Sequence, residues 1–220
     1  MLDRVVVVLH GRFSHEERLL AVVDAADSVI AADGGANWLD AHGRVPQQIV
    51  GDMDSVDPEL LRRLEDMGCK VSRYPAHKDE TDAELALAAA AALKPRQIVL
   101  LGALGGRIDH ALGNLSLLAM RELAGIAVRV YDGLSTVWLV TDAGEIRGAP
   151  GDIVSLIPWA GDACGIHTEG LAYPLNGETL TFGPSRGISN VLLGEQGRVT
   201  LASGQLLIVH TPLADLEQEG

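Results

Sequence analysis

Residues 28–55 read SVIAADGGANWLDAHGRVPQQIVGDMDS, and this stretch decides the fold class. A short β-branched run at 28–32 precedes an acid-glycine turn, a helix-like segment over 34–42 and a second apolar run at 48–50. A strand, a helix and another strand in this order indicate a βαβ unit with parallel strands. Each strand runs into an acidic turn, so the stretch predicts both a sheet and the edge at which a site would form.

The same alternation continues through the first 130 residues. Two helix starts, at Ser14 and Thr81, carry the capping-box pattern, with a glutamate three residues later. We therefore predict a mostly parallel sheet flanked by helices for a domain over 1–134. Further strands are expected at 5–9, 70–73, 97–101 and 127–131, and further helices at 15–26, 58–67, 82–93 and 109–123.

The pattern changes after about residue 134. No strong helical periodicity remains, and short strands alternate with Gly-rich turns such as 142–144. This predicts a C-terminal all-β sandwich domain over 135–220. Its strands are expected at 136–141, 153–157, 178–182, 189–193, 198–202 and 205–210.

Composition narrows the class of partner. Hydrophobic residues make up 47% of the 220 residues, and the formal net charge is −13. That charge argues against nucleic-acid and anionic-membrane partners, which need clustered Lys and Arg. The two cysteines have no metal-binding spacing, and the apolar runs at 5–9 and 85–93 are too short for a signal peptide or a membrane span. We expect a cytoplasmic protein.

Carboxylates cluster where four strands should end. Acidic loops occur at 33–35, 52–55, 78–82 and 105–110. In open α/β sheets, ligands bind outside the carboxyl ends of the strands. The four loops are therefore expected to converge on one rim.

Asp52 and Asp54 flank Met53. In an extended segment, residues i and i+2 point the same way, so both carboxylates would face one cation such as Mg²⁺. The alternative for an isolated pair is a solvated turn before a helix, but the other acidic loops favour the metal. Asp82 either binds the ion or only stabilises the start of its helix. Lys78 either meets a phosphate or is a solvated surface lysine.

Two glycine segments permit close backbone approach to an anion: Gly34-Gly35 and residues 102–106. Tight turns explain them equally well. Arg107, beside the second segment, suits phosphate oxygens, and Asp109 and Asn114 follow. Nothing in the sequence indicates covalent catalysis, whereas acids, one Lys, one Arg and glycines suit phosphoryl chemistry.

Five motifs in order resemble those of thiamine pyrophosphokinases. They are residues 33–37, 51–55, 78–82 with 84–86, 102–110 with Asn114, and 187–190. The resemblance implies an α/β nucleotide domain followed by a β-sandwich, transfer of pyrophosphate from ATP to thiamine, and a homodimer. Two departures stand out: residues 191–193, Val-Leu-Leu, include no aromatic to stack on thiamine, and Gly113 stands where alanine is commoner.

The resemblance also implies roles for particular residues. Asp52, Asp54 and Asp82 would hold Mg²⁺ and form the catalytic centre, with Asp109 close by. Ser189 and Asn190 would bind thiamine, and Leu192 or Leu193 would offer it apolar contact, although Ser189-Asn190 also reads as a simple turn. The ATP-binding set would be Asp33, Gly34, Gly35, Lys78, Arg107 and Asn114.

Two other functions remain open from the residues alone. A D-x-D pattern in an α/β domain also fits a metal-dependent nucleotide-sugar glycosyltransferase. A non-catalytic module that senses nucleotide or thiamine would keep the pocket without the chemistry.

Overall fold

The structure is a computed structural model that describes residues 2–216. The chain folds into two compact units, with the boundary between Gly133 and Leu134. Of the predicted second domain, residues 217–220 lie outside the described part of the chain.

The first unit is built on a parallel sheet with the order β6-β5-β1-β2-β3-β4. β1 lies between β5 and β2, with Val6 facing Val29 and Val99, and Val5 to Val8 are wholly buried. Such valine runs suit a strand covered on both faces. The strands are β1 Arg4–Val8, β2 Ser28–Ala32, β3 Gln48–Gly51, β4 Lys70–Arg73, β5 Gln97–Leu101 and β6 Ala127–Tyr131.

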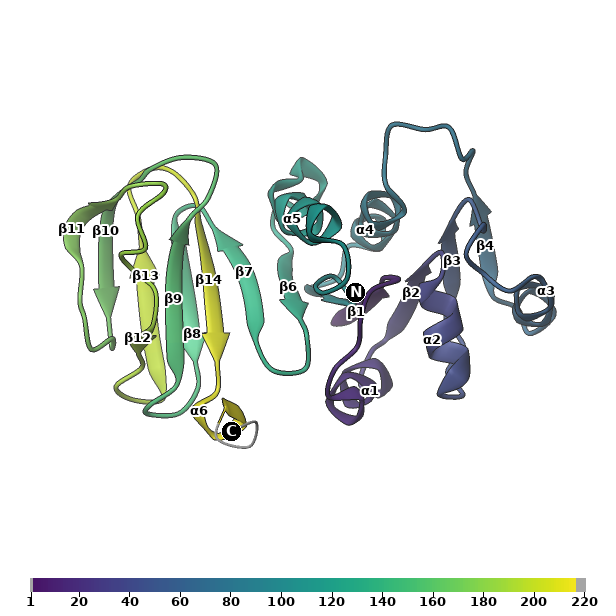
Figure 1. Ribbon diagram of the computed structural model, residues 1–220, viewed down its shortest axis with the longest axis horizontal. Helices are drawn as coiled ribbons and strands as arrows, with labels where there is room; N and C mark the ends of the chain where they lie inside the picture. The colour runs from purple at the N-terminus through teal and green to yellow at the C-terminus, as the bar shows by residue number, and fades with distance from the viewer. Residues whose placement is uncertain (1, 217–220) are drawn as a thin grey trace. The chain divides into compact units, whose positions relative to one another are not determined.

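Helices cover both faces of this sheet. Figure 1 shows α4 and α5 over one face and α1 and α2 over the other. α4 is alanine-rich, and Ala86 and Ala90 are wholly buried, which lets the helix pack closely over β1, β2 and β3. The helices are α1 Glu16–Asp24, α2 Gly35–Ala41, α3 Pro58–Asp66, α4 Asp82–Ala92 and α5 Ile108–Ser116, followed by short 3-10 turns at Leu117–Ala119 and Arg121–Leu123.

The sequence predicts N-terminal caps for two helices, and the structure has only one of them. The Thr81 hydroxyl accepts the Glu84 N–H at 3.2 Å, so the predicted cap of α4 is confirmed. The predicted Ser14 cap is wrong, because His15, with φ of 53°, occupies the N-cap of α1 and its side chain makes no capping bond. The helix expected over 109–123 ends at Ser116, since Met120 adopts an extended conformation between the two 3-10 turns.

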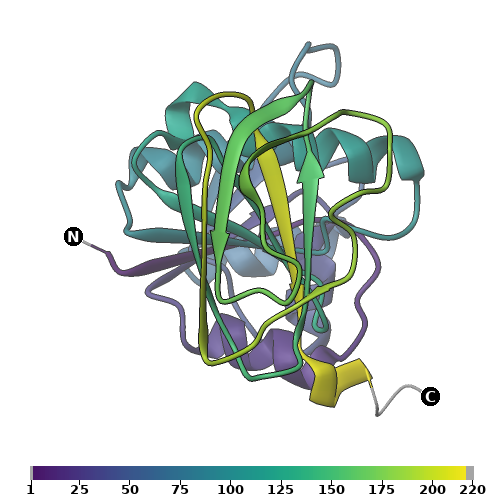
Figure 2. The ribbon, with the colours of Figure 1, turned by 90° about the vertical axis from the view of Figure 1, so that its left-hand side faces the viewer.

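The second unit has two antiparallel sheets, with the orders β12-β9-β14-β7 and β11-β10-β13-β8. Figure 2 is viewed from the side of this unit and shows its strands connected by loops at their ends. Leu156, Ile166 and Ile208 are at most 1% exposed within its core. The elements are β7 Thr136–Val140, β8 Ala143–Arg147, β9 Ile153–Pro158, β10 Ala163–Glu169, β11 Asn176–Leu180, β12 Asn190–Val191, β13 Gln196–Thr200, β14 Leu206–Thr211 and helix α6 Leu213–Leu216.

The predicted fold class is confirmed: an α/β sheet unit is followed by an antiparallel β unit. Two strands of the second unit were missed. The sequence predicts a turn over 142–144, but Ala143 begins β8. Glycine suits position 144 because a Cβ there would lie 2.6 Å from the Val140 side chain. β10 is interrupted by register shifts and by Gly165 with φ of 63°, which break the alternating pattern.

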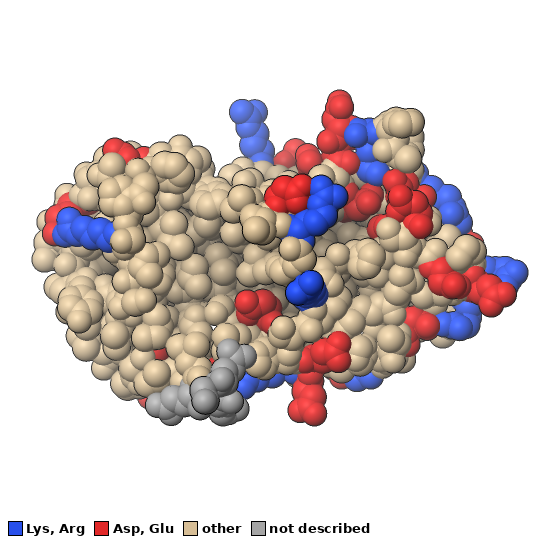
Figure 3. Space-filling model, in the orientation of Figure 1, with Lys and Arg blue, Asp and Glu red and all other residues tan. Residues whose placement is uncertain are grey.

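The two units differ in the charge of the surface seen in Figure 3. On the face drawn in Figure 3, acidic and basic side chains are interspersed over the first unit, whereas the second unit shows few charged atoms. Within residues 2–216, no helix has the length and hydrophobicity to cross a membrane.

Candidate active site

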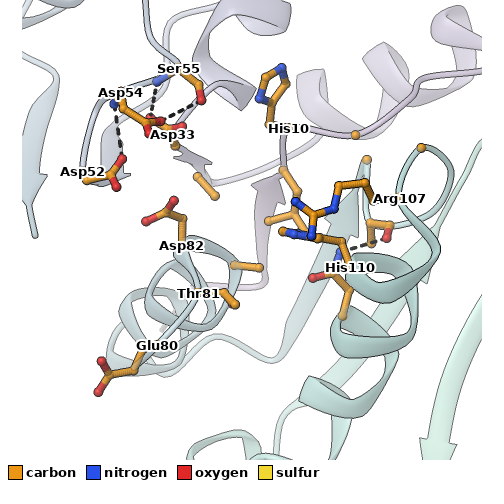
Figure 4. A pocket seen from close by; sticks show the side chains of 18 of the residues that line it. His10, Asp33, Asp52, Asp54, Ser55, Glu80, Thr81, Asp82, Arg107 and His110 are labelled. Carbon is orange, nitrogen blue, oxygen red and sulfur yellow. Dashed lines mark hydrogen bonds between the residues drawn. The ribbon is translucent and has the colours of Figure 1, made fainter. Parts of the chain in front are cut away.

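The loops at the carboxyl ends of the parallel strands enclose a pocket of about 650 Å³ in the first unit. Segments after β1, β2, β3 and β5 contribute to it, together with the first turn of α4. The convergence expected from the strand ends is therefore what the geometry shows. One part of the pocket is acidic and another is basic, as Figure 4 displays.

Three carboxylates form what we call the acidic group: Asp33, Asp52 and Asp82. One oxygen of each lies within 4.8 Å of the others. Asp33 is only 5% exposed. Burial raises the pKa of Asp33, and the charge of Asp82 adds to this, although hydrogen bonds from Ser55 and Gly34 oppose it. Carboxylates held this close repel one another, so the group is suited to a cation.

Unusual backbone conformations bring the acidic group together. Asp33 has φ of 43°, and its N–H donates to the Val50 carbonyl at 2.9 Å. Gly51 lies where a Cβ would be 3.0 Å from the Asp33 Cβ and 3.1 Å from Asp82 Oδ1. A larger residue at position 51 would therefore crowd the acidic group.

Asp54 lies outside the acidic group, although it lines the same pocket. Met53 has φ of 68°, so the segment is not extended as the prediction assumed. The Asp54 N–H donates to Asp52 Oδ1 at 3.2 Å, and the Asp54 carboxylate accepts the Ser55 hydroxyl at 2.8 Å. Extended-strand alternation therefore does not align Asp52 with Asp54, and binding of a metal by Asp54 stays a prediction.

Lys78 places a positive charge beside the acidic group. Its ammonium lies 3.0 Å from Asp82 and 3.9 Å from Asp52, and only 11% of its side chain is exposed. Burial by itself would lower the pKa of Lys78, but contact with Asp82 and the charges of Asp52 and Asp33 raise it above its ordinary value. The Lys78 ammonium is therefore paired with carboxylates of the pocket, and Lys78 is not a solvated surface lysine.

The basic part of the pocket contains His10, Arg12, Arg107 and His110. The loop after β1 and the loop after β5 meet here, and a Cβ on Gly11 would lie 1.9 Å from the Gly102 carbonyl oxygen. Sequence reasoning missed His10 and Arg12. The signal was present, because they follow the strand at 5–9 just as the acidic loops follow theirs.

The remaining predicted ATP-binding residues have positions that explain their types. A Cβ on Gly34 would lie 2.4 Å from the His10 ring, and one on Gly35 would lie 2.2 Å from the Val8 carbonyl. The Asn114 amide donates to the Ala103 carbonyl at 2.8 Å and so ties α5 to the glycine loop. Of these three residues, Asn114 lines the pocket, whereas Gly34 and Gly35 pack against the end of β1 and the segment that follows it.

Asp109 does not line the pocket. It forms an exposed ion pair with Arg107 at 2.6 Å, and this hydrogen-bonded contact holds the pKa of Asp109 at about 2. The carboxylate of Asp109 is therefore paired with Arg107 at the protein surface.

Ser189 and Asn190 lie in the second unit, next to and within β12. Ser189 has φ of 59°, and its N–H donates to the Ser155 hydroxyl at 3.0 Å. Asn190 is 5% exposed and is occupied by backbone contacts to Tyr173 and Val191. Of the two leucines expected to offer thiamine apolar contact, Leu192 is wholly buried and Leu193 is 63% exposed, so the geometry favours Leu193.

Carboxylates gathered at the carboxyl edge of a parallel sheet, with a lysine among them and arginines across the pocket, define an α/β enzyme that acts on phosphorylated substrates. Comparison with known proteins makes the class specific. The family model "Thiamin pyrophosphokinase, catalytic domain" matches residues 19–129, and "Thiamin pyrophosphokinase, vitamin B1 binding domain" matches residues 145–206. The chain belongs to the thiamin pyrophosphokinase family.

Relatives agree over most of the length. A thiamine pyrophosphokinase of Bacillus subtilis is 32% identical over 185 residues, covering 83% of this chain and 86% of that protein. Thiamine pyrophosphokinase 1 of Oryza sativa is 28% identical, covering 89% and 82%. A crystal structure of the Bacillus subtilis enzyme superimposes with a TM-score of 0.84 at 29% identity, covering 96% of this chain and all of that one.

The family's reaction is the transfer of pyrophosphate from ATP to thiamine, and the chain is an enzyme of this type. The glycosyltransferase and the non-catalytic sensing module find no support among these relatives.

Proposed function

We propose that the pocket of the first unit binds ATP with Mg²⁺ and that the acidic group is the centre of the transfer. The observation that carries this is the meeting of three carboxylates within 4.8 Å of one another, one of them buried. Oxygen-only donors of this kind suit Mg²⁺, which takes a few carboxylates together with water and substrate phosphates.

The residues fit such an ion. Burial and the charge of Asp82 raise the pKa of Asp33, and Lys78 contributes one positive charge beside three carboxylates. Asp33, Asp52 and Asp82 would hold the ion, with Asp54 next to them in the pocket. Mg²⁺, when bound, would neutralise phosphate charge as the transfer proceeds.

The basic residues receive the phosphate chain in this proposal. Arg12 and Arg107 can each present a planar fork of N–H donors to phosphate oxygens. The ion pair with Asp109 orients Arg107, and Lys78 supplies a point charge between the acidic group and the phosphates. Positioning and charge stabilisation of this type carry most phosphoryl-transfer catalysis.

The chemical step is an in-line displacement. The thiamine hydroxyl oxygen forms a bond to the β-phosphorus of ATP, the bond from that phosphorus to the bridging α–β oxygen breaks, and AMP leaves. The hydroxyl proton passes to a carboxylate of the pocket. Thiamine binds the second unit near Ser189 and Asn190, which lie within the segment 145–206.

We also propose that the protein is a cytoplasmic homodimer. Both cysteines are free thiols, as expected in a reducing compartment. Light scattering at assay concentrations should give the mass of two chains. A fully active monomer would refute the dimer without affecting the proposed reaction.

Metal removal tests the proposed function most simply. Chelation with EDTA should abolish the formation of AMP from ATP and thiamine, and excess Mg²⁺ should restore it. Undiminished turnover in EDTA would contradict a metal held by the acidic group.

A further inference from the structure

Tyr173 is an aromatic side chain that the second unit leaves 69% exposed. It lies on a segment paired with β12: Leu171 bridges Leu192, and the Ala172 N–H donates to the Val191 carbonyl at 2.9 Å. This register sets Tyr173 opposite Asn190. The aromatic ring and the polar residue expected to bind thiamine therefore share one place in the fold.

The backbone of Tyr173 is held on both sides by one buried side chain. Asn190 Oδ1 accepts the Tyr173 N–H at 2.9 Å, and Asn190 Nδ2 donates to the Tyr173 carbonyl at 2.8 Å. Pro174 follows, and a residue before proline is restricted to extended conformations. A nearly inaccessible amide thus fixes the backbone of a residue whose own side chain faces solvent, which is how a binding surface is preorganised.

We propose that Tyr173 supplies the aromatic surface for the thiamine rings and that Asn190 is a positioning residue acting through it. This rests on the proposed function and names the residue that recognises its second substrate. Thiamine is flat and cationic, so an exposed phenol ring fits it by stacking and cation–π attraction. Residues 191–193 offer no aromatic, whereas Tyr173 lies within the matched "vitamin B1 binding domain".

Two apolar side chains near β12 are also exposed. Leu193, whose N–H donates to the Gly170 carbonyl, is 63% exposed, and Ile188, two residues before Asn190, is 48% exposed. Leu193 follows β12, and Ile188 lies in the turn that precedes it. An exposed aromatic ring suits a heteroaromatic substrate better than a sugar or a peptide carboxylate.

The test compares Tyr173→Leu, which keeps apolar bulk, with Tyr173→Phe, which keeps the ring. Tyr173→Leu should raise the KM for thiamine roughly 2- to 30-fold, the range that a cation–π contact implies, and leave the KM for ATP unchanged. Tyr173→Phe should stay within about twofold of wild type, by the same reasoning that the ring and not the hydroxyl makes the contact. Phe182→Leu is the matched control, since Phe182 is an aromatic of the same unit with 58% exposure.

Asn190 is tested through the double variant. If it acts through Tyr173, adding Asn190→Ala to Tyr173→Leu should raise the thiamine KM little further, because coupled residues are not additive. Full additivity would make Asn190 an independent thiamine ligand and overturn its positioning role.

Thiamine binding by calorimetry accompanies the kinetics and separates two failures. If wild type binds thiamine but forms no AMP, the proposed function fails while the variants still test Tyr173. An unchanged thiamine Kd in a folded Tyr173→Leu protein, or an equal loss in Phe182→Leu, would overturn the proposal.

Discussion

At the scale of single residues, the site depends on backbone conformations that side chains rarely adopt. Asp33 and Met53 both have positive φ, at 43° and 68°. Non-glycine residues in this region are uncommon and cluster at functional sites. The acidic group contains Asp33, which follows β2, where the predicted metal set had Asp54.

This geometry predicts different consequences for two adjacent aspartates. Asp52→Asn should lower kcat at least 100-fold, the order expected for a lost transition-state electrostatic contact, whereas Asp54→Asn should lower it about tenfold or less. Asp52→Asn should also reduce the rise in Tm that Mg²⁺ and ATP produce in wild type, because binding to the folded state is what raises Tm.

Equal losses in both variants would contradict the division between the acidic group and Asp54. Circular dichroism supplies the control, since neither exchange removes core volume and both proteins should remain folded.

The sequence indicated which residues would meet but not how. Strand-end acids predicted that the loops carrying Asp33, Asp52 and Asp82 would converge, because parallel strands bring their carboxyl ends to one edge. The set expected at the ion was Asp52, Asp54 and Asp82, and the positive φ at Met53 was not foreseen. The positive φ at Met53 left no residue-type signal, since methionine rarely adopts it. The contacts of Asn190 with Tyr173 join residues 17 apart and depend on pairing that no local pattern encodes.

At the scale of elements, helix starts explain why one capping pattern was confirmed and another was wrong. Thr81 has extended backbone angles that aim its hydroxyl at the Glu84 N–H, whereas left-handed His15 occupies the N-cap of α1. The loop from Ser14 also passes Gly133, whose Cβ position would lie 2.6 Å from the Ser14 carbonyl oxygen. Tertiary contact thus overrides a local cap pattern.

Matched alanine substitutions test this difference. Thr81→Ala should lower the free energy of unfolding by about 1 kcal/mol, because one N–H of the first turn of α4 loses its acceptor. Ser14→Ala should change it by less than about 0.5 kcal/mol, the usual effect of a surface exchange. Urea titration measures both, and an equal loss in the two variants would show that Ser14 caps a helix in solution.

At the scale of the whole molecule, the second unit contains a buried carboxylate with a structural role. Asp152 is 4% exposed and accepts bonds from the Ala149 and Leu213 N–H groups and from His210 at 2.8–3.0 Å. Burial would raise the pKa of Asp152, but these bonds outweigh it and lower the pKa below its ordinary value. The ionised carboxylate therefore stabilises the folded state.

Because the pKa of Asp152 is lowered in the folded state, the free energy of unfolding should depend on pH. A carboxyl whose folded pKa is depressed contributes its full stability above its unfolded pKa of about 4, and that stability is lost as pH falls through the folded value. Asp152→Asn should be less stable than wild type by about 2 kcal/mol at pH 7. The difference should shrink below about pH 4.

Denaturant titrations at several pH values measure the difference in free energy of unfolding between wild type and Asp152→Asn. Glu145→Gln is the control, since its exposed ion pair with Arg147 should matter by less than about 0.5 kcal/mol. A difference that is constant down to pH 2.5 would contradict a stabilising ionised Asp152.

The central claim is that this chain moves two phosphoryl groups in one step. The most direct measurement is a product analysis of wild-type protein incubated with ATP, Mg²⁺ and thiamine. We expect AMP and thiamine diphosphate in equal amounts, both dependent on thiamine and both lost in Asp52→Asn. Formation of ADP with thiamine monophosphate, or AMP that appears without thiamine, would contradict it.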